Sequence, residues 1–191
     1  MIFRREINHK LVCGNIEVIC GSMFSGKTEE LIRRLKRCLI AKKRIAVFKP
    51  EIDARYEEKK IVSHNKISID AYVVKKTKDI LLNSKDFDVI AIDEAQFFDD
   101  ELLETVNVLA NKGKRIIIAG LDMDYMGRPF GIMSNILAVA NDVTKLRAIC
   151  NNCGCLASYS FRKNNTDTLI HVGEKNDYMA LCRTCFFKQN E

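Results

Sequence analysis

One glycine-rich segment restricts the fold of this chain more than any other feature does. Residues 21–28 read GSMFSGKT, which fits the pattern G-x-x-x-x-G-K-[ST]. An apolar run at residues 16–20 precedes this segment, and residues 28–41 carry apolar side chains at helical spacing. A strand, a glycine-rich turn and a helix in that order predict a loop whose backbone N–H groups face a phosphate. A turn that binds nothing is the alternative, and the flanking strand and helix disfavour it.

The residues of this loop are expected to play different parts. Lys27 should reach the β and γ phosphates of a nucleotide, and the Thr28 hydroxyl should ligate Mg²⁺. The helix that follows directs its positive N-terminus at the same anion. The other loop positions supply the backbone cradle: Gly21, Ser22, Met23, Phe24, Ser25 and Gly26.

A second motif lies further along the chain, where the apolar run at residues 89–92 ends in Asp93 and Glu94. An apolar strand that ends in Asp is the usual partner of a phosphate loop, because its carboxylate holds the Mg²⁺ shell. An ionised Glu94 is suited to accept a proton from an attacking hydroxyl or water. A plain surface Asp-Glu pair is the alternative. The two motifs predict ATP, Mg²⁺ and phosphoryl transfer, but they do not identify the acceptor.

Residues 16–149 alternate short apolar runs with helical stretches. Further strands are expected at residues 44–48, 115–119 and 145–149, and helices at residues 101–110 and 131–140. This alternation predicts an α/β fold of the P-loop, RecA-like kind, with a mostly parallel sheet and helices on both faces. Residues 51–68 are polar and without period, so we expect a loop there, with a short strand near residues 61–63. Residues 1–149 are therefore predicted to form an ATP-binding domain.

The eight cysteines concentrate towards the end of the chain, where five lie between positions 150 and 185. Cys150 and Cys153 form one C-x-x-C pair, and Cys182 and Cys185 form another. Two such pairs complete a tetrahedral four-sulfur site that favours a structural Zn²⁺, while a redox pair is the alternative. Cys155 breaks the spacing and is left out. Residues 150–191 are thus predicted to be a small zinc-binding lobe of short strands, with no helix, and its metal is expected to lie outside the phosphate chemistry.

Composition narrows the function further. The chain has a formal charge of +6, and much of the excess lies on and just after the helix expected at residues 28–41. A solvated helix face is our interpretation, and a nucleic-acid surface is the alternative. No run of eighteen apolar residues predicts a membrane helix, and residues 1–14 do not read as a signal peptide. The protein is expected to be cytoplasmic.

Taken together, these motifs resemble the thymidine kinases that carry a zinc lobe, a family found in bacteria, animals and poxviruses. The resemblance covers nearly the whole chain from Ile16. Besides the phosphate loop and the four cysteines, its marks are residues 53–56 (DARY), 93–98 (DEAQFF), 120–122 (GLD), 128–131 (RPFG) and 177–178 (DY).

The resemblance implies a reaction and a role for several residues. Glu94 would take the proton of the 5′-hydroxyl of thymidine, and the products would be dTMP and ADP. Asp93, Gln96 and Thr28 would serve the ATP–Mg²⁺ side. Asp53 and Arg55 would lie close to the phosphates.

The resemblance also implies a nucleoside pocket. A lasso-like loop from the zinc lobe would cover the nucleoside and read the base edge with its main chain; its residues would be Leu169, Ile170, His171, Val172 and Gly173. Tyr178 would lie beside the sugar and base, and Phe97 and Tyr125 would add aromatic surface. Met23, Leu121 and Ser160 match the pocket for the thymine 5-methyl group. Because adjacent side chains diverge, one of Phe97 and Phe98 is expected in the core.

The chain departs from the family pattern in two places. Ala95 stands where many members have Gly, and Tyr125 stands where Phe is frequent. The resemblance further implies a homotetramer, with no nucleic-acid partner and no membrane. The rival function is a nucleic-acid-stimulated ATPase whose zinc ribbon grips DNA or RNA. Such motors commonly need a second lobe or a ring, and this chain has no obvious room for another lobe.

Overall fold

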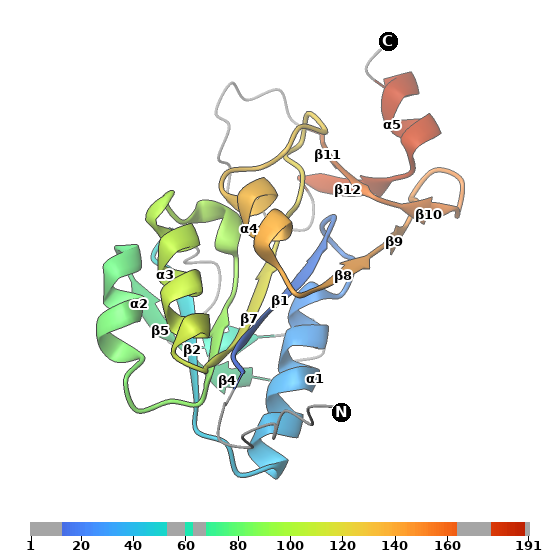
Figure 1. Cartoon of the computed structure of the whole chain (residues 1–191). Coiled ribbons are helices and arrows are strands. Elements are labelled where there is room, and N and C mark those ends of the chain that lie inside the picture. The colour runs from blue at the N-terminus through green and yellow to red at the C-terminus, as the bar shows by residue number, and fades with distance from the viewer. Residues whose placement is uncertain (1–12, 53–59, 63–67, 164–176, 190–191) are drawn as a thin grey trace, which may run out of the picture.

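The computed structural model describes residues 13–52, 60–62, 68–163 and 177–189 (Figure 1). Its centre is a six-stranded sheet in the order β5-β2-β6-β7-β1-β8, and every neighbouring pair in this sheet is parallel. These strands are β1 (Asn15–Gly21), β2 (Ile45–Pro50), β5 (Tyr72–Val74), β6 (Val89–Ile92), β7 (Arg115–Gly120) and β8 (Asp142–Leu146). Parallel pairing brings all their carboxyl ends to one edge of the sheet.

Helices cover both faces of this sheet (Figure 1). One face packs against α1 (Lys27–Ile40), and the other packs against α2 (Thr77–Asn83), α3 (Glu101–Asn111) and α4 (Met133–Val139). The pleat of β1 shows why, since Val18 packs on the side of α3 and α4 while Ile19 packs against Leu31 and Leu35 of α1. A strand buried on both faces reads as a mostly apolar run, and in residues 16–20 (IEVIC) only Glu17 interrupts it.

The predicted α/β fold is confirmed, but one of its strands was misplaced. We expected a strand at residues 145–149, whereas β8 covers Asp142–Leu146 and the chain then turns into β9 (Ala148–Ile149). The reason is that β8 is an edge strand whose residues Asp142 and Val143 are exposed, so it carries no apolar run. Sequence reasoning also missed the short β5 and α2. The strand expected near residues 61–63 is confirmed as β3 (Lys60–Val62), paired with β4 (Ser68–Asp70).

The cysteine-rich lobe has a small core of its own, drawn from residue 148 onward. Two antiparallel pairs build it: β9 with β10 (Leu156–Ala157), and β11 (Tyr159–Arg162) with β12 (Tyr178–Leu181). The expectation of no helix here was wrong, because α5 (Arg183–Gln189) follows β12. Phe186 of α5 stacks on Tyr159 with ring centroids 4.5 Å apart, so tertiary packing supports a helix too short to show in the sequence.

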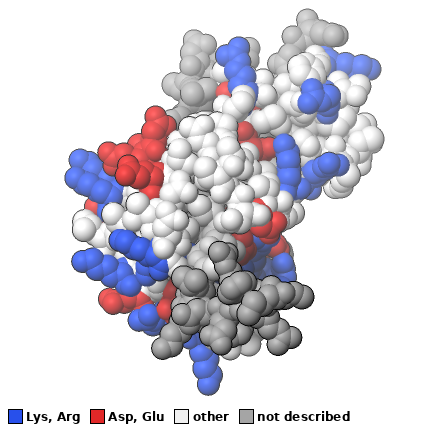
Figure 2. Space-filling model, viewed as in Figure 1, with Lys and Arg blue, Asp and Glu red and all other residues white. Residues whose placement is uncertain are grey.

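Charged side chains do not gather into a continuous basic stripe on the face shown in Figure 2. Lysines and arginines alternate there with acidic residues, and an uncharged area lies over α4, whose sequence MSNILAV has no ionisable side chain. Among the residues that the structure describes, no helix is long and apolar enough to span a membrane.

A buried ion network ties the strands together near the amino end of β1. The Glu17 carboxylate accepts hydrogen bonds from Arg34 Nη1 at 2.8 Å and from Arg115 Nε at 2.6 Å. Arg34 in turn donates to Glu30 on α1 and to Thr144 on β8. Burial alone would raise the pKa of Glu17, but the hydrogen bonds from Arg115, Asn15 and Arg34 outweigh it and hold this pKa below its ordinary value. The ionised carboxylate therefore joins β1 to α1 and β7, and Arg34 extends the network to β8.

Replacing Glu17 should destabilise the fold strongly. We expect Glu17→Ala to lower the free energy of unfolding by about 3 kcal/mol, because it leaves the buried Arg34 with less compensation. Urea unfolding monitored by circular dichroism measures this change. The control is Arg44→Ala, which breaks the exposed pair with Asp88 and should change the free energy of unfolding far less, because solvent screens that pair. Equal losses of unfolding free energy in the two variants would show that the buried network stabilises the fold no more than an exposed ion pair does.

Candidate active site

The segment between β1 and α1 has the curled backbone that its glycines predict. The φ angles of Gly21, Phe24 and Gly26 are 142°, 64° and 86°, all positive. A Cβ atom on Gly21 would lie 2.3 Å from the carbonyl oxygen of Leu146, so only glycine fits between β1 and β8. Lys27 Nζ donates to the carbonyl oxygen of Ser22 at 2.8 Å and so reaches back across the loop. The segment thus forms a cradle beyond the carboxyl end of β1.

The charges and polar groups around this cradle suit a phosphate and its metal ion. Burial lowers the pKa of Lys27, whereas the carboxylates of Glu94, Asp93 and Asp122 act to raise it. Ser25 Oγ is buried, and no group in the described part of the chain hydrogen-bonds it. A buried hydroxyl without a partner is costly. A polyphosphate with Mg²⁺ would supply such a partner, and Lys27, Thr28 and Asp93 offer the ammonium, hydroxyl and carboxylate groups that suit it.

The acidic turn after β6 is strained in a way that points to function. Asp93 is buried, with its N–H on the carbonyl oxygen of Phe48 at 2.9 Å, and its Oδ1 accepts the N–H of Glu94 at 3.0 Å. Glu94 has a φ of 52°, in the left-handed region that glycine favours. Such strain costs on the order of 1 kcal/mol and clusters at functional sites. Because the positive φ falls on Glu94, Ala95 needs no glycine-like freedom, and the departure from the family pattern at that position is harmless.

The side chain of Gln96 links this turn to the neighbouring strand end. Gln96 lies in the short 3-10 helix η1 (Ala95–Phe97), and only 3% of it is exposed. Its Nε2 donates to Glu94 Oε2 at 2.6 Å, and its Oε1 accepts the N–H of Leu121 at 2.9 Å. The side-chain amide of Gln96 therefore bridges the Glu94 carboxylate and the backbone N–H of Leu121.

The cysteine-rich lobe touches the phosphate loop directly. Met23 donates its backbone N–H to Ser160 Oγ of β11 at 3.0 Å, and Ser22 Oγ donates to the carbonyl oxygen of Ala157 at 3.4 Å. The lobe therefore contacts the phosphate loop through β11 and the residues before it. Contacts between residues more than a hundred positions apart leave no trace in local spacing.

Aromatic side chains from both parts of the chain meet at one arginine. The guanidinium carbon of Arg162 lies 3.8 Å from the ring centroid of Tyr125, and its Nε donates to the Tyr178 hydroxyl at 3.2 Å. Arg162 is buried and was missed by sequence reasoning. As expected, Phe97 and Phe98 diverge: Phe98 packs on the sheet core, and Phe97 meets Phe130 edge-on with centroids 5.8 Å apart.

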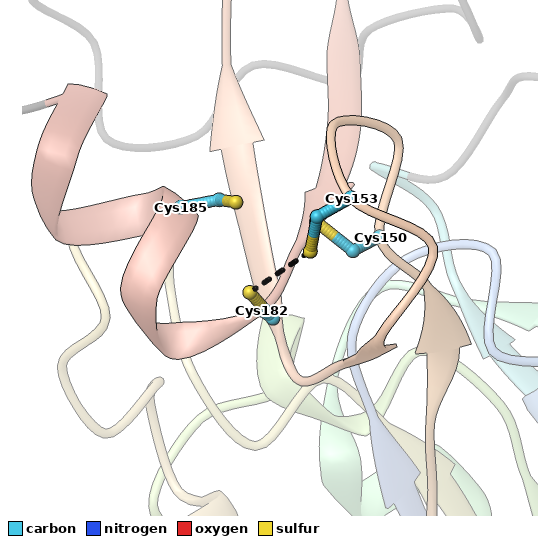
Figure 3. A group of neighbouring side chains, drawn as sticks. All are labelled: Cys150, Cys153, Cys182 and Cys185. Carbon is cyan, nitrogen blue, oxygen red and sulfur yellow. Dashed lines mark hydrogen bonds between the residues drawn. The ribbon is translucent and has the colours of Figure 1, made fainter.

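The four predicted metal ligands converge at the base of the lobe (Figure 3). Their sulfur atoms all lie within 4.8 Å of one another, and Cys155 is not among them. The sulfurs of Cys153 and Cys182 are 3.6 Å apart, close to the separation of about 3.8 Å that tetrahedral Zn–S bonds impose. Burial works against ionisation of Cys150, yet backbone N–H groups of Cys182 and Cys153 lower its pKa to about 6. This all-protein sulfur set fits a structural zinc ion.

The family to which these features belong follows from comparison with known proteins. The model of the thymidine kinase family matches residues 14–186 of the chain. The chain belongs to the thymidine kinase family. Thymidine kinases of Porphyromonas gingivalis and Bacteroides thetaiotaomicron are 52% and 53% identical to it; the alignments cover 98% and 92% of this chain and 93% and 88% of theirs. That of Rhodothermus sp. is 50% identical over 94% of this chain and 84% of its own.

Among solved structures, the Legionella pneumophila ATPase DotB aligns with 66% of this chain and 34% of its own, at 16% identity and a TM-score of 0.42. A likeness at that level supports no inference about this thymidine kinase family member.

The structure brings seven of the predicted site residues into three separate contacts. Met23 meets Ser160, Glu94 meets Leu121 through Gln96, and Tyr125 meets Tyr178 through Arg162. Two groups of predicted residues lie outside the part of the chain that is described: Asp53 and Arg55, and the lasso residues Leu169, Ile170, His171, Val172 and Gly173.

Removing the metal should weaken nucleotide binding as well as disturb the lobe. We expect Cys153→Ser to lose zinc and to bind the Mg²⁺ complex of AMP-PNP roughly fivefold more weakly, because a loop anchored by Ser160 loses a hydrogen bond worth about 1 kcal/mol. Metal analysis and calorimetric titration measure both effects. Cys155→Ser is the matched control and should retain both properties, since Cys155 is exposed and outside the sulfur group. A zinc-free variant with normal AMP-PNP affinity would refute the coupling.

Proposed function

We propose that this chain transfers the γ-phosphoryl group of ATP to the 5′-hydroxyl of thymidine, giving dTMP and ADP. The observation that carries the proposal is the placement of Glu94 beside the phosphate loop. Its carboxylate acts on the pKa of Lys27, which is the loop's own cation. A base next to the lysine that meets the transferring phosphate suits attack by an alcohol.

The phosphate side of the mechanism uses the loop and the first acid of the turn. Backbone N–H groups of residues 21–28 hold the polyphosphate, and Lys27 stabilises the charge that develops on the transferred group. Thr28 and Asp93 are the residues that would hold Mg²⁺, which neutralises phosphate charge when bound. From the family resemblance we include Asp53 and Arg55 near the phosphates.

The acceptor side begins with Glu94, which takes the proton of the 5′-hydroxyl as the oxygen attacks phosphorus. Met23, Leu121 and Ser160 form the proposed methyl pocket. Its support is that Ser160 contacts Met23 directly and that Leu121 is one amide away from Glu94. Phe97, Tyr125 and Tyr178 supply aromatic surface, and residues 169–173 cover the base through their main chain.

We further infer a structural Zn²⁺ on Cys150, Cys153, Cys182 and Cys185, a homotetrameric assembly and a cytoplasmic location. The sulfur cluster supports the first of these, and the resemblance supports the second. Residues 1–149 act as the ATP-binding domain and residues 150–191 as the zinc lobe. The rival, a nucleic-acid-stimulated ATPase, is disfavoured by family membership. We therefore propose neither a nucleic-acid partner nor a membrane.

Removal of the proposed base should abolish most turnover without abolishing binding. We expect Glu94→Gln to lower kcat by roughly 10²–10⁴-fold, as loss of a general base usually does. Affinities for thymidine and for Mg²⁺·AMP-PNP should stay within about twofold, because the amide keeps the size of the side chain. Coupled ADP-release kinetics and calorimetry measure these quantities. Glu101→Gln, an exposed acid on α3, is the control. Near-normal turnover of Glu94→Gln would remove the residue from this role.

Base selectivity tests the pocket independently. A methyl group placed in an apolar pocket contributes about 1 kcal/mol, so we expect kcat/KM for deoxyuridine to be roughly fivefold below that for thymidine. Deoxycytidine should be a far poorer substrate, because its edge presents an amine where thymidine presents a carbonyl. Competition between the three nucleosides at fixed ATP gives the ratios. Equal use of deoxycytidine and thymidine would contradict the pocket.

A further inference from the structure

We propose that Gln96 is a positioning residue for the acceptor side of the reaction. In this proposal it holds the Glu94 carboxylate against the carboxyl end of β7, instead of serving the ATP–Mg²⁺ side as the family resemblance implies. The inference rests on the proposed function, since it assigns how the base of that reaction is held.

Both ends of the Gln96 amide are engaged, and their partners fix its orientation. Leu121 N–H can only donate, so the atom 2.9 Å from it is the amide oxygen. The amide nitrogen then faces Glu94 Oε2 at 2.6 Å, where a carboxylate can only accept. A hydrogen bond from an amide to an ionised carboxylate is stronger than one between neutral groups. The protonated amide nitrogen is not a metal ligand, and it is the nitrogen that faces Glu94.

The packing around Gln96 leaves this arrangement no freedom. A Cβ atom on Gly120 would lie 2.9 Å from Gln96 Oε1 and 2.9 Å from Met133 Sδ. On the other side, a Cβ atom on Gly131 would lie 2.6 Å from the carbonyl oxygen of Gln96. The two glycines, which belong to the motifs GLD and RPFG, thus make room for one buried glutamine. Neighbours that crowd Oε1 and the backbone hold the amide where it is.

The carboxylate needs such a hold because of the turn that carries it. Glu94 has a left-handed backbone and a half-buried side chain, and Gln96 Nε2 donates to its carboxylate at 2.6 Å. The amide joins it to Leu121, a residue of the proposed methyl pocket. The proposed base, Glu94, and the pocket residue Leu121 are thereby both held at the carboxyl end of β7. A displacement of about 1 Å between reacting groups can cost on the order of 10²-fold in rate.

The first test is Gln96→Met, which keeps the volume and removes both polar atoms. We expect kcat with thymidine to fall roughly 10²-fold, while the affinities for thymidine and for Mg²⁺·AMP-PNP change less than about twofold. The control is Thr77→Val, which removes a partly buried hydrogen bond, from the buried Thr77 Oγ1 of α2 to Asp99 at 2.6 Å, and touches neither Glu94 nor Leu121. It should lower thermal stability and leave kcat unchanged.

The second test is Gln96→Glu, which keeps an oxygen that can accept the N–H of Leu121. This variant still tests the proposal if Gln96→Met fails to fold. A second carboxylate cannot donate to Glu94 and repels it, so we expect kcat to fall at least as far as in Gln96→Met. If Gln96 instead served the metal, the new carboxylate would keep or tighten Mg²⁺·AMP-PNP binding and preserve turnover. Retained turnover in Gln96→Glu therefore overturns the proposal.

A double variant separates positioning from an independent effect. In the Glu94→Gln background, Gln96→Met should cost less than about threefold more, because the group it positions is already gone. Losses that multiply, or a tenfold weaker affinity for Mg²⁺·AMP-PNP in Gln96→Met, overturn the proposal. The proposed function has a separate outcome: an unsubstituted enzyme that does not phosphorylate thymidine refutes that function, whereas normal kcat in Gln96→Met refutes only the role of Gln96.

Discussion

Parallel pairing of β6, β7 and β1 is the constraint on which the rest of this site depends. In the sheet β7 lies between the other two, so its carboxyl end separates the phosphate loop after β1 from the acidic turn after β6. Neighbouring strands lie about 4.8 Å apart. Gly21, Asp93 and Leu121, which follow or end these strands, are therefore gathered at one edge although up to a hundred residues separate them in the chain. The side-chain amide of Gln96 bridges the interval between the ends of β6 and β7.

A rigid sheet also carries the strained turns that the site needs. Phe24 and Glu94 both take positive φ angles without being glycines, and both lie where the chain leaves a buried strand. Such strain persists only when the surroundings hold it. At the opposite end of β1, the Glu17 carboxylate fastens β7 and β8 to α1. At the carboxyl end of β1, Leu146 of β8 packs against Gly21, and Ser160 of β11 accepts a hydrogen bond from the N–H of Met23.

The sequence predicted those parts of the molecule that local pattern encodes. The segment GSMFSGKT and the run before Asp93 placed the loop, the acids and two central strands correctly, because buried parallel strands are continuously apolar. Strand β8 was misplaced since an edge strand lacks that pattern. Arg162, the contact of Met23 with Ser160 and the bond from Gln96 to Leu121 depend on tertiary approach. No spacing rule reports such contacts, and the resemblance alone assigned Gln96 to the nucleotide.

The phosphate loop and the acidic turn are proposed to transfer phosphate to the hydroxyl of a nucleoside, and not to water as in a nucleic-acid-stimulated ATPase. The most direct measurement is the release of ADP from ATP by the purified protein, with thymidine or with single- and double-stranded polynucleotide added, and with dTMP quantified in parallel. The account predicts that thymidine stimulates turnover and that one dTMP forms for each ADP, while polynucleotide has no effect. Turnover that responds to polynucleotide, or ADP released without dTMP in the presence of thymidine, would contradict it.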